Sequence, residues 1–156
     1  MKLATPGDRT IEMSREFAAP RSMVFDAYTK PELVRQWLGV FNGYTMPICE
    51  IDLRVGGSYR YVWEGNGTKM GVRGVYREIV RPARIVATEK FDEAWYPGDA
   101  IATVTFVEQA GQTRLLISVE YASQEARAAV LQTPMEQGVA AGFEMLDALL
   151  SKGTKS

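Results

Sequence analysis

Histidine is absent from this chain of 156 residues, and cysteine occurs once, at position 49. Without histidine there is no imidazole general base, no Ser-His or Cys-His catalytic pair and no zinc site of the histidine type. A single cysteine forms neither an intramolecular disulfide nor a thiolate metal cluster. The sequence therefore predicts no bound metal and no cofactor.

Long apolar runs and a surplus of one charge are missing as well. No stretch approaches the roughly 18 apolar residues of a membrane-spanning helix, and the opening segment MKLATPGDRTIEMSREF lacks the apolar core of a secretion signal. The 18 basic and 19 acidic residues give a net charge of −1, which excludes the broad positive field of non-specific nucleic-acid binding. We expect a cytoplasmic protein that engages neither a membrane nor a nucleic acid.

The remaining composition is that of an ordinary globular protein, with 46% hydrophobic and 24% charged residues. A chain of this length forms one domain and buries about 69% of its unfolded surface, enough for one core and an internal ligand pocket. We expect a single domain over residues 1–156, with its core at about 9–151.

Alternation of apolar and polar residues predicts a strand at 9–17. Six further strands are expected at 44–53, 58–63, 70–80, 84–91, 102–108 and 113–121. Their hairpin-length connections, such as Gly65-Asn66-Gly67, indicate an antiparallel sheet rather than βαβ units.

Helical spacing appears in two places outside these strands. Two short helices are expected between the first strand and the others, the second beginning with a capping box of Thr29 and Glu32. A short helix is expected at 123–133, and a long one begins at a second capping box, Thr133 with Glu136. One long helix against a sheet is a two-layer α+β fold.

Several short segments, spread over about 140 residues, carry a family resemblance: 15–20 (REFAAP), 24–29 (VFDAYT), 37–39 (WLG), 52–57 (DLRVGG), 74–78 (GVYRE), 103–106 (TVTF), 113–115 (TRL) and 135–138 (MEQG). They resemble the SRPBCC superfamily, also called START-like or helix-grip. Within it the chain is most similar to bacterial homologues of the C-terminal domain of the Hsp-ninety ATPase activator. The resemblance implies a curved antiparallel sheet of six to seven strands wrapped around a long C-terminal helix, in the order strand, helix, helix, six strands, helix.

In this superfamily the sheet and the helix enclose a mostly apolar cavity, so the resemblance implies a small hydrophobic ligand. The residues agree, because Gly138 and Gly142 lie one turn apart on the apolar face of the last helix and aromatic rings alternate along 59–63. Close packing of that helix on the sheet is the alternative reading of the same glycines. The expected cavity lining is Trp37, Tyr59, Tyr61, Trp63, Tyr76, Phe106, Leu115, Ile117, Met135, Gly138, Val139, Gly142, Phe143 and Leu146.

Two positions depart from the family. Val139 stands where relatives often carry tryptophan, and Val119 stands where many carry histidine. Both changes make the interior smaller or less polar, which weakens the transfer of any catalytic role from relatives.

Carboxylates offer the other chemistry. Glu78 and Asp52 are the candidates for acid–base catalysis, as a cyclase, hydrolase or dehydratase would need, if they are buried beside tyrosines. The plainer interpretation pairs Glu78 with a neighbouring arginine and Asp52 with Arg54 at a glycine turn. Cys49 is expected to be a small core residue.

Three functions are compatible with these observations. We expect binding of a small hydrophobic molecule by a monomer or homodimer, rather than catalysis. The alternatives are an enzyme that uses the pocket and a chaperone-associated interaction module.

Overall fold

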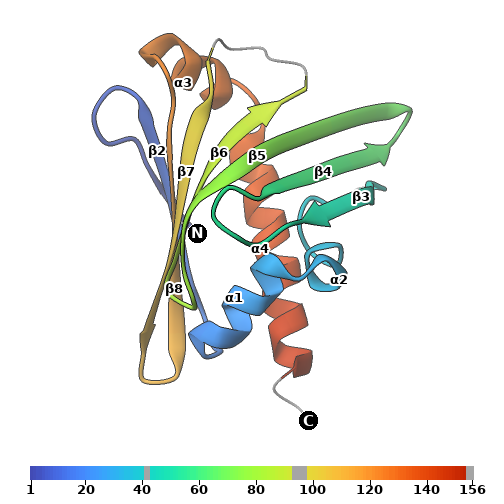
Figure 1. The fold of residues 1–156 in the computed structure, drawn as a ribbon, viewed down its shortest axis with the longest axis vertical. Helices are drawn as coiled ribbons and strands as arrows, with labels where there is room; N and C mark the ends of the chain where they lie inside the picture. Colours follow the sequence, from blue (N-terminus) through green and yellow to red (C-terminus); the bar gives the residue numbers. More distant parts are fainter. Residues whose placement is uncertain (41–42, 93–97, 154–156) are drawn as a thin grey trace.

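The computed structural model describes residues 1–40, 43–92 and 98–153. In this part of the chain eight strands form one antiparallel sheet in the order β1-β2-β8-β7-β6-β5-β4-β3 (Figure 1). The strands are β1 (Lys2–Ala4), β2 (Thr10–Phe17), β3 (Thr45–Ile51), β4 (Ser58–Gly65), β5 (Thr68–Val80), β6 (Arg84–Phe91), β7 (Ala100–Gln109) and β8 (Gln112–Glu120). The helices are α1 (Arg21–Thr29), α2 (Pro31–Val34), α3 (Gln124–Leu131) and α4 (Met135–Gly153).

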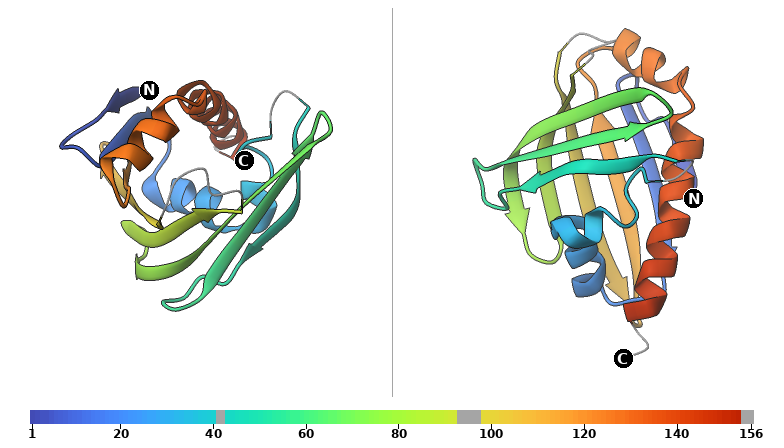
Figure 2. Two further views of the ribbon diagram at one scale, coloured as in Figure 1. Left: turned by 90° about the horizontal axis from the view of Figure 1, so that it is seen from above. Right: turned by 90° about the vertical axis from the view of Figure 1, so that its right-hand side faces the viewer.

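The sheet curves, and α4 lies across its open side, as the view from above in Figure 2 shows. The helix α1 packs against β7 and β8, α2 packs against β3, and α4 packs against α1, α3 and β2. This arrangement confirms the α+β fold with a long C-terminal helix gripped by the sheet. No helix of the described residues has both the length and the apolar character needed to cross a bilayer.

The expected strand count of six to seven is wrong, because the described residues contain eight strands. The additional strand is β1, which pairs antiparallel with β2 from Lys2 to Ala4, outside the expected core at 9–151. Three residues are too few to show an alternating pattern, and β1 is held by main-chain pairing to the edge of β2. The expected element order also lacked this first strand.

The hairpin connections follow from residues that accept a positive φ. Asn66 and Gly67 have φ angles of 52° and 75°, as the predicted hairpin turn requires. Gly65 pairs with Thr68, so the turn between β4 and β5 consists of two residues. Ala110 and Gly111, at 54° and 78°, form the corresponding turn between β7 and β8. These tight turns fix the register of both hairpins.

Both expected threonine caps are wrong. The Thr29 hydroxyl donates to the Phe25 carbonyl at 2.8 Å, and Lys30 precedes the first residue of α2. Thr133 likewise donates to the Val130 carbonyl, at 2.6 Å. Each threonine hydroxyl thus bonds the last turn of the preceding helix, and the residues directly before α2 and α4 are Lys30 and Pro134 instead.

The carboxyl-terminal half of α4 is fixed to the core and to β2. Phe143, Leu146 and Leu150 are at most 5% exposed. Arg15 of β2 donates from Nη1 to the Phe143 carbonyl at 2.6 Å, and its Nη2 lies 3.3 Å from Glu144 and 3.6 Å from Asp147. The arginine therefore ties the sheet to this half of the helix.

Candidate functional site

Aromatic rings line the inner face of β4 and β5. The ring of Tyr59 lies 5.0 Å from that of Tyr61 and 5.6 Å from that of Tyr76, and Tyr61 lies 6.0 Å from Trp63. These four side chains are 5–9% exposed. We call Tyr59, Tyr61 and Tyr76 the tyrosine cluster.

A glycine makes room for the tyrosine cluster. A Cβ atom at Gly74 would overlap the ring of Tyr59 and the carbonyl of Thr88. With no side chain there, Tyr59 reaches across β5 and its hydroxyl donates to that carbonyl of β6 at 2.8 Å. The Tyr61 and Tyr76 hydroxyls are hydrogen-bonded to each other.

Around Trp37 the expected lining residues are closely packed. The Trp37 ring stacks on Phe143 at 6.5 Å and contacts Tyr28 at 5.3 Å, and its Nε1 donates to the Ala27 carbonyl at 2.8 Å. The expected lining residues that are at most 1% exposed are Trp37, Phe106, Leu115, Phe143 and Leu146. These residues form the closed end of the core.

Near the beginning of α4 the expected lining residues are less buried. Met135, Gly138 and Val139 are only half-buried, and Gly142 is buried against Trp37, whose carbonyl oxygen would lie 3.4 Å from an added Cβ. Gly142 therefore faces the segment after α2. The inner-facing residues Phe91, Ala102 and Glu89 of the sheet are half-buried too. Of the remaining expected residues, Ile117 on β8 is 8% exposed.

Glu89 is a carboxylate on the inner face of the sheet. Side chains alternate between the two faces along a strand. Glu89 lies two residues after Ala87 and four after Ile85 on β6, so it points to the same inner face as these buried residues. Among the described residues it has no hydrogen-bond or ion-pair partner. Burial without compensation raises the pKa of Glu89 from 4.5 to about 7.

Two phenols share this environment. Tyr28 of α1 is half-buried, and burial followed by the nearby Glu89 charge raises its pKa. Burial also raises the pKa of Tyr76, partly offset by its hydrogen bond with Tyr61. Tyr28 and Tyr76 are therefore neutral hydroxyls beside a carboxyl group that titrates near neutral pH.

The carboxylates expected for catalysis lie elsewhere. Asp52 is half-exposed and 2.9 Å from Arg54, and Glu78 is half-exposed and 3.4 Å from Arg84. Both are in surface ion pairs, as the plainer interpretation had them. Cys49 is buried, and burial raises the pKa of its thiol. The described residues contain no group of three or more histidine, cysteine, aspartate or glutamate side chains placed to hold a metal ion.

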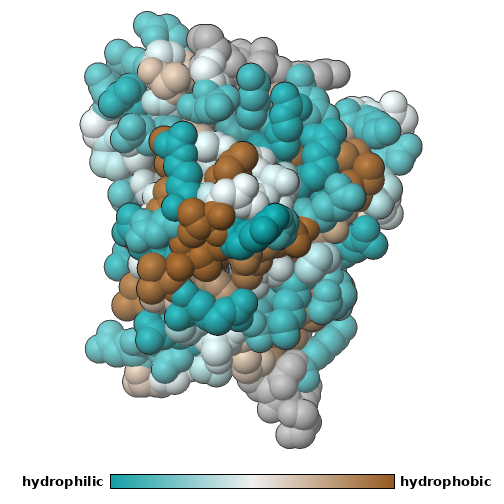
Figure 3. Space-filling model, in the orientation of Figure 1, coloured by the Kyte–Doolittle hydropathy of each residue, from teal (hydrophilic) through white to brown (hydrophobic). Residues whose placement is uncertain are grey.

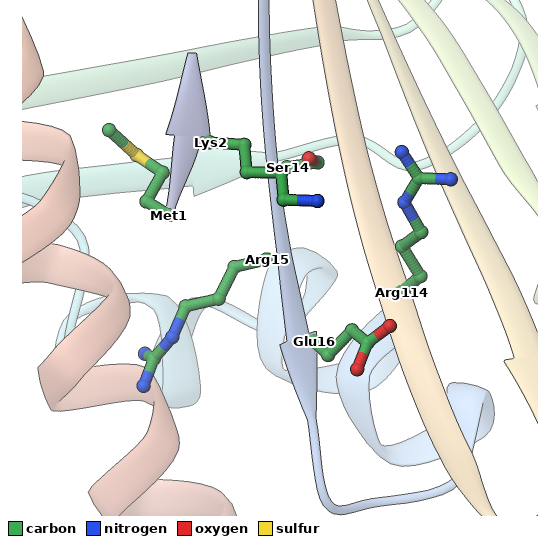
Figure 4. Close-up of a pocket in the computed structure, with 6 residues that line it drawn as sticks. All are labelled: Met1, Lys2, Ser14, Arg15, Glu16 and Arg114. Atoms are coloured by element: carbon green, nitrogen blue, oxygen red, sulfur yellow. The ribbon is translucent and has the colours of Figure 1, made fainter.

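A hollow of about 480 Å³ on the surface is unrelated to the expected lining. Met1, Lys2, Ser14, Arg15, Glu16 and Arg114 line it. Figure 4 shows that Arg15 reaches away from Arg114 and toward α4. The lining contains both basic and acidic side chains, so it does not form a binding site for an anion or a cation.

The outer surface also carries apolar residues. Val75, Val80 and Val107 are 44–50% exposed on the sheet. Figure 3 shows an apolar patch near the middle of the molecule, with hydrophilic residues around and across it. The patch is a surface feature, separate from the interior.

Two residues of the interior were missed from the sequence. Glu89 interrupts the apolar alternation Ile85, Ala87 and Phe91, and Arg15 falls between Met13 and Phe17 in the same way. A charged side chain at an inward position was the available signal in both cases. Arg15 has partners on α4, and Glu89 has none among the residues that the structure describes.

Comparison with known proteins gives a family and a set of similar structures. The family described as Activator of Hsp90 ATPase homolog 1-like protein matches residues 18–151. A crystal structure of a protein from Rhodobacter sphaeroides has a TM-score of 0.88 and 29% identity, covering 97% of this chain and 98% of that chain. One from Chromobacterium violaceum has a TM-score of 0.76 and 30% identity, covering 91% and 96%.

An HSP90 activator from Plasmodium falciparum is more distant. Its crystal structure has a TM-score of 0.57 and 24% identity, covering 72% of each chain, so the likeness is one of fold. No curated protein matches the sequence.

Proposed function

The chain belongs to the Activator of Hsp90 ATPase homolog 1-like family of SRPBCC domains, and from that premise we propose that it binds a small hydrophobic molecule between the sheet and the first half of α4. Domains of this kind commonly bind hydrophobic ligands. The ligand would lie against the tyrosine cluster, with the half-buried Met135 and Val139 on the opposite side.

The unequal filling of the interior carries this proposal. Trp37, Phe106 and Phe143 are at most 1% exposed, whereas Ala102 and Val139 also face inward and remain half-buried. Apolar surface left partly open beside aromatic rings and a few hydroxyls is typical of a ligand site.

Filling the proposed site with a side chain tests it. Ala102 lies between Ala87 and Val119 across the inner face of the sheet. Ala102→Leu adds three carbon atoms there without changing charge, while Thr103→Leu on the outer face of the same strand is the matched control. Binding of an aromatic and lipid panel is measured by thermal shift and by quenching of tryptophan fluorescence.

We expect hydrophobic ligands to raise the melting temperature of the wild type and of Thr103→Leu, and to bind Ala102→Leu at least tenfold more weakly. If the space is open, the added leucine also leaves stability nearly unchanged. In a solidly packed interior it would cost about 1–3 kcal/mol. That cost, together with no response to any ligand of the panel, would overturn the proposal.

A further inference from the structure

No side chain of the two neighbouring strands covers the half-buried carboxyl group of Glu89 on the inner face of the sheet. Glu89 pairs with Ala100 of β7, and because Arg73 pairs with Lys90, the residue opposite Glu89 on β5 is Gly74. Its two cross-strand neighbours are thus the two smallest residues. Neither has a side chain long enough to cover or to hydrogen-bond the carboxyl group.

The groups that do face Glu89 from other elements are neutral. Tyr28 approaches from α1, Tyr76 lies diagonally across on β5, and Tyr59 spans Gly74 to bond the carbonyl of Thr88. No lysine or arginine of the described residues lies within ion-pair distance of Glu89. A buried carboxylate without a partner costs free energy, so a site of this kind is retained at the expense of stability.

Aromatic rings around an acidic group form the arrangement that binds organic cations. Ring faces attract a cation, and a carboxylate adds a charge-assisted hydrogen bond. We propose that the ligand carries a protonated amine, which the Glu89 carboxylate binds while the tyrosine cluster contacts the apolar part. This inference rests on the proposed function, because it assigns a ligand class to the same interior site.

The same geometry disfavours anionic ligands. A fatty acid or other carboxylate would place a second negative charge beside Glu89. No described cation lies beside Glu89 to offset it, because the inward-facing Arg15 of β2 is paired with Glu144 and Asp147 of α4. A neutral alcohol could form hydrogen bonds with the hydroxyl and carboxyl groups but would form no ion pair with Glu89. The predicted order of affinity is therefore amine, then alcohol, then carboxylate.

Three ligands of matched shape test this order: 2-(2-naphthyl)ethylamine, 2-(2-naphthyl)ethanol and 2-naphthylacetate. Their affinities are measured by isothermal titration calorimetry at pH 7.5. We expect the amine to bind the wild type about 10- to 100-fold more tightly than the alcohol, the range of a hydrogen bond to a charged group. The acetate should bind more weakly than the alcohol.

Substitutions at Glu89 locate the effect. In Glu89→Gln the preference for the amine should disappear while the affinity of the alcohol changes less than about threefold, and Glu89→Asp should retain part of the preference. Glu64→Gln removes an exposed glutamate of β4 and is the matched control, expected to behave as the wild type. Circular dichroism verifies that each variant is folded.

The outcomes separate the two proposals. If the alcohol binds but the amine binds no better, or if the amine preference survives Glu89→Gln, the amine inference is overturned and the hydrophobic site stands. If none of the three ligands binds, and Ala102→Leu behaves as an overpacked core, both proposals fall. Should Glu89→Gln not fold, the ranking of the three ligands on the wild type still decides.

Discussion

Replacing Glu89 by glutamine is expected to stabilise the fold, and the gain should grow as the pH rises. The folded-state pKa is raised from 4.5 to about 7 because burial disfavours the charged form. Below the unfolded value the group is neutral in both states and costs nothing. As the pH rises from 4.5 to about 7, the folded state retains a proton that the unfolded state releases, so the cost grows with pH. Above the folded value the cost is constant, because the native state then holds a buried charge that the unfolded state exposes to water.

The size of the gain follows from linkage. A shift of this extent corresponds to at most about 3 kcal/mol at pH 8 and above. Glu89 is half-buried, so partial hydration reduces the expected gain to about 1–2 kcal/mol. Glutamine keeps the shape and removes the charge, so packing losses are small.

Urea denaturation of the wild type and of Glu89→Gln at pH 4.5 and pH 8 measures the difference, in which the titration of all other groups largely cancels. Glu64→Gln should change stability by less than about 0.5 kcal/mol at both pH values. A gain for Glu89→Gln that is equal at the two pH values, or a loss at pH 8, would refute the reasoning that the charge is buried and uncompensated.

Three further predictions concern stability and are measured by urea denaturation at neutral pH. Gly74→Ala should lower the free energy of unfolding by more than about 2 kcal/mol, because its Cβ would meet the Thr88 carbonyl and the Tyr59 ring. Gly142→Ala should raise it by about 0.5–1 kcal/mol, because its Cβ would have ordinary contacts within a helix. Similar effects at both sites would contradict this prediction. Arg15→Met should lower the free energy of unfolding by about 1–3 kcal/mol, because the hydrogen bond to the Phe143 carbonyl is lost. Arg9→Met, which removes a surface ion pair of 3.7 Å with Glu120, is the control and should change it by less than about 0.5 kcal/mol. Ser123→Ala should cost about 1 kcal/mol, because the Ser123 hydroxyl accepts from the backbone N–H of Ala126 at the start of α3; an unchanged midpoint would exclude that cap.

The strands were predictable because their signals are local. The alternation of apolar and polar residues determines which side chains point inward, and Asn66-Gly67 determines the position of a turn. Both can therefore be predicted without knowledge of the rest of the chain. The strand β1 was missed for the same reason, since three residues paired to the edge of β2 carry no pattern of their own. The threonine caps were wrong because the sequence motif does not say which of two adjacent helices uses the hydroxyl.

For the candidate site, the sequence predicted only which residues face the interior of the sheet. The sequence placed Tyr59, Tyr61 and Phe106 inward, but how much of that face is covered depends on the distance between α4 and each strand. Trp37 is 1% exposed and Val139 is half-buried, a difference that depends on long-range packing and that no local pattern encodes. Glu89 was overlooked because its meaning depends on Gly74 and Ala100, residues adjacent in the sheet but distant in sequence.

The attachment of α4 has a consequence for how its backbone moves. No residue of 135–141 is fully buried, whereas Phe143, Leu146 and Leu150 are held by the core and the helix is bonded to Arg15. Local opening should therefore begin at the amino-terminal turns of α4, whose amides would exchange with deuterium sooner than those near its carboxyl end. If a ligand binds beside Met135 and Val139 as proposed, its presence would slow exchange at these turns first.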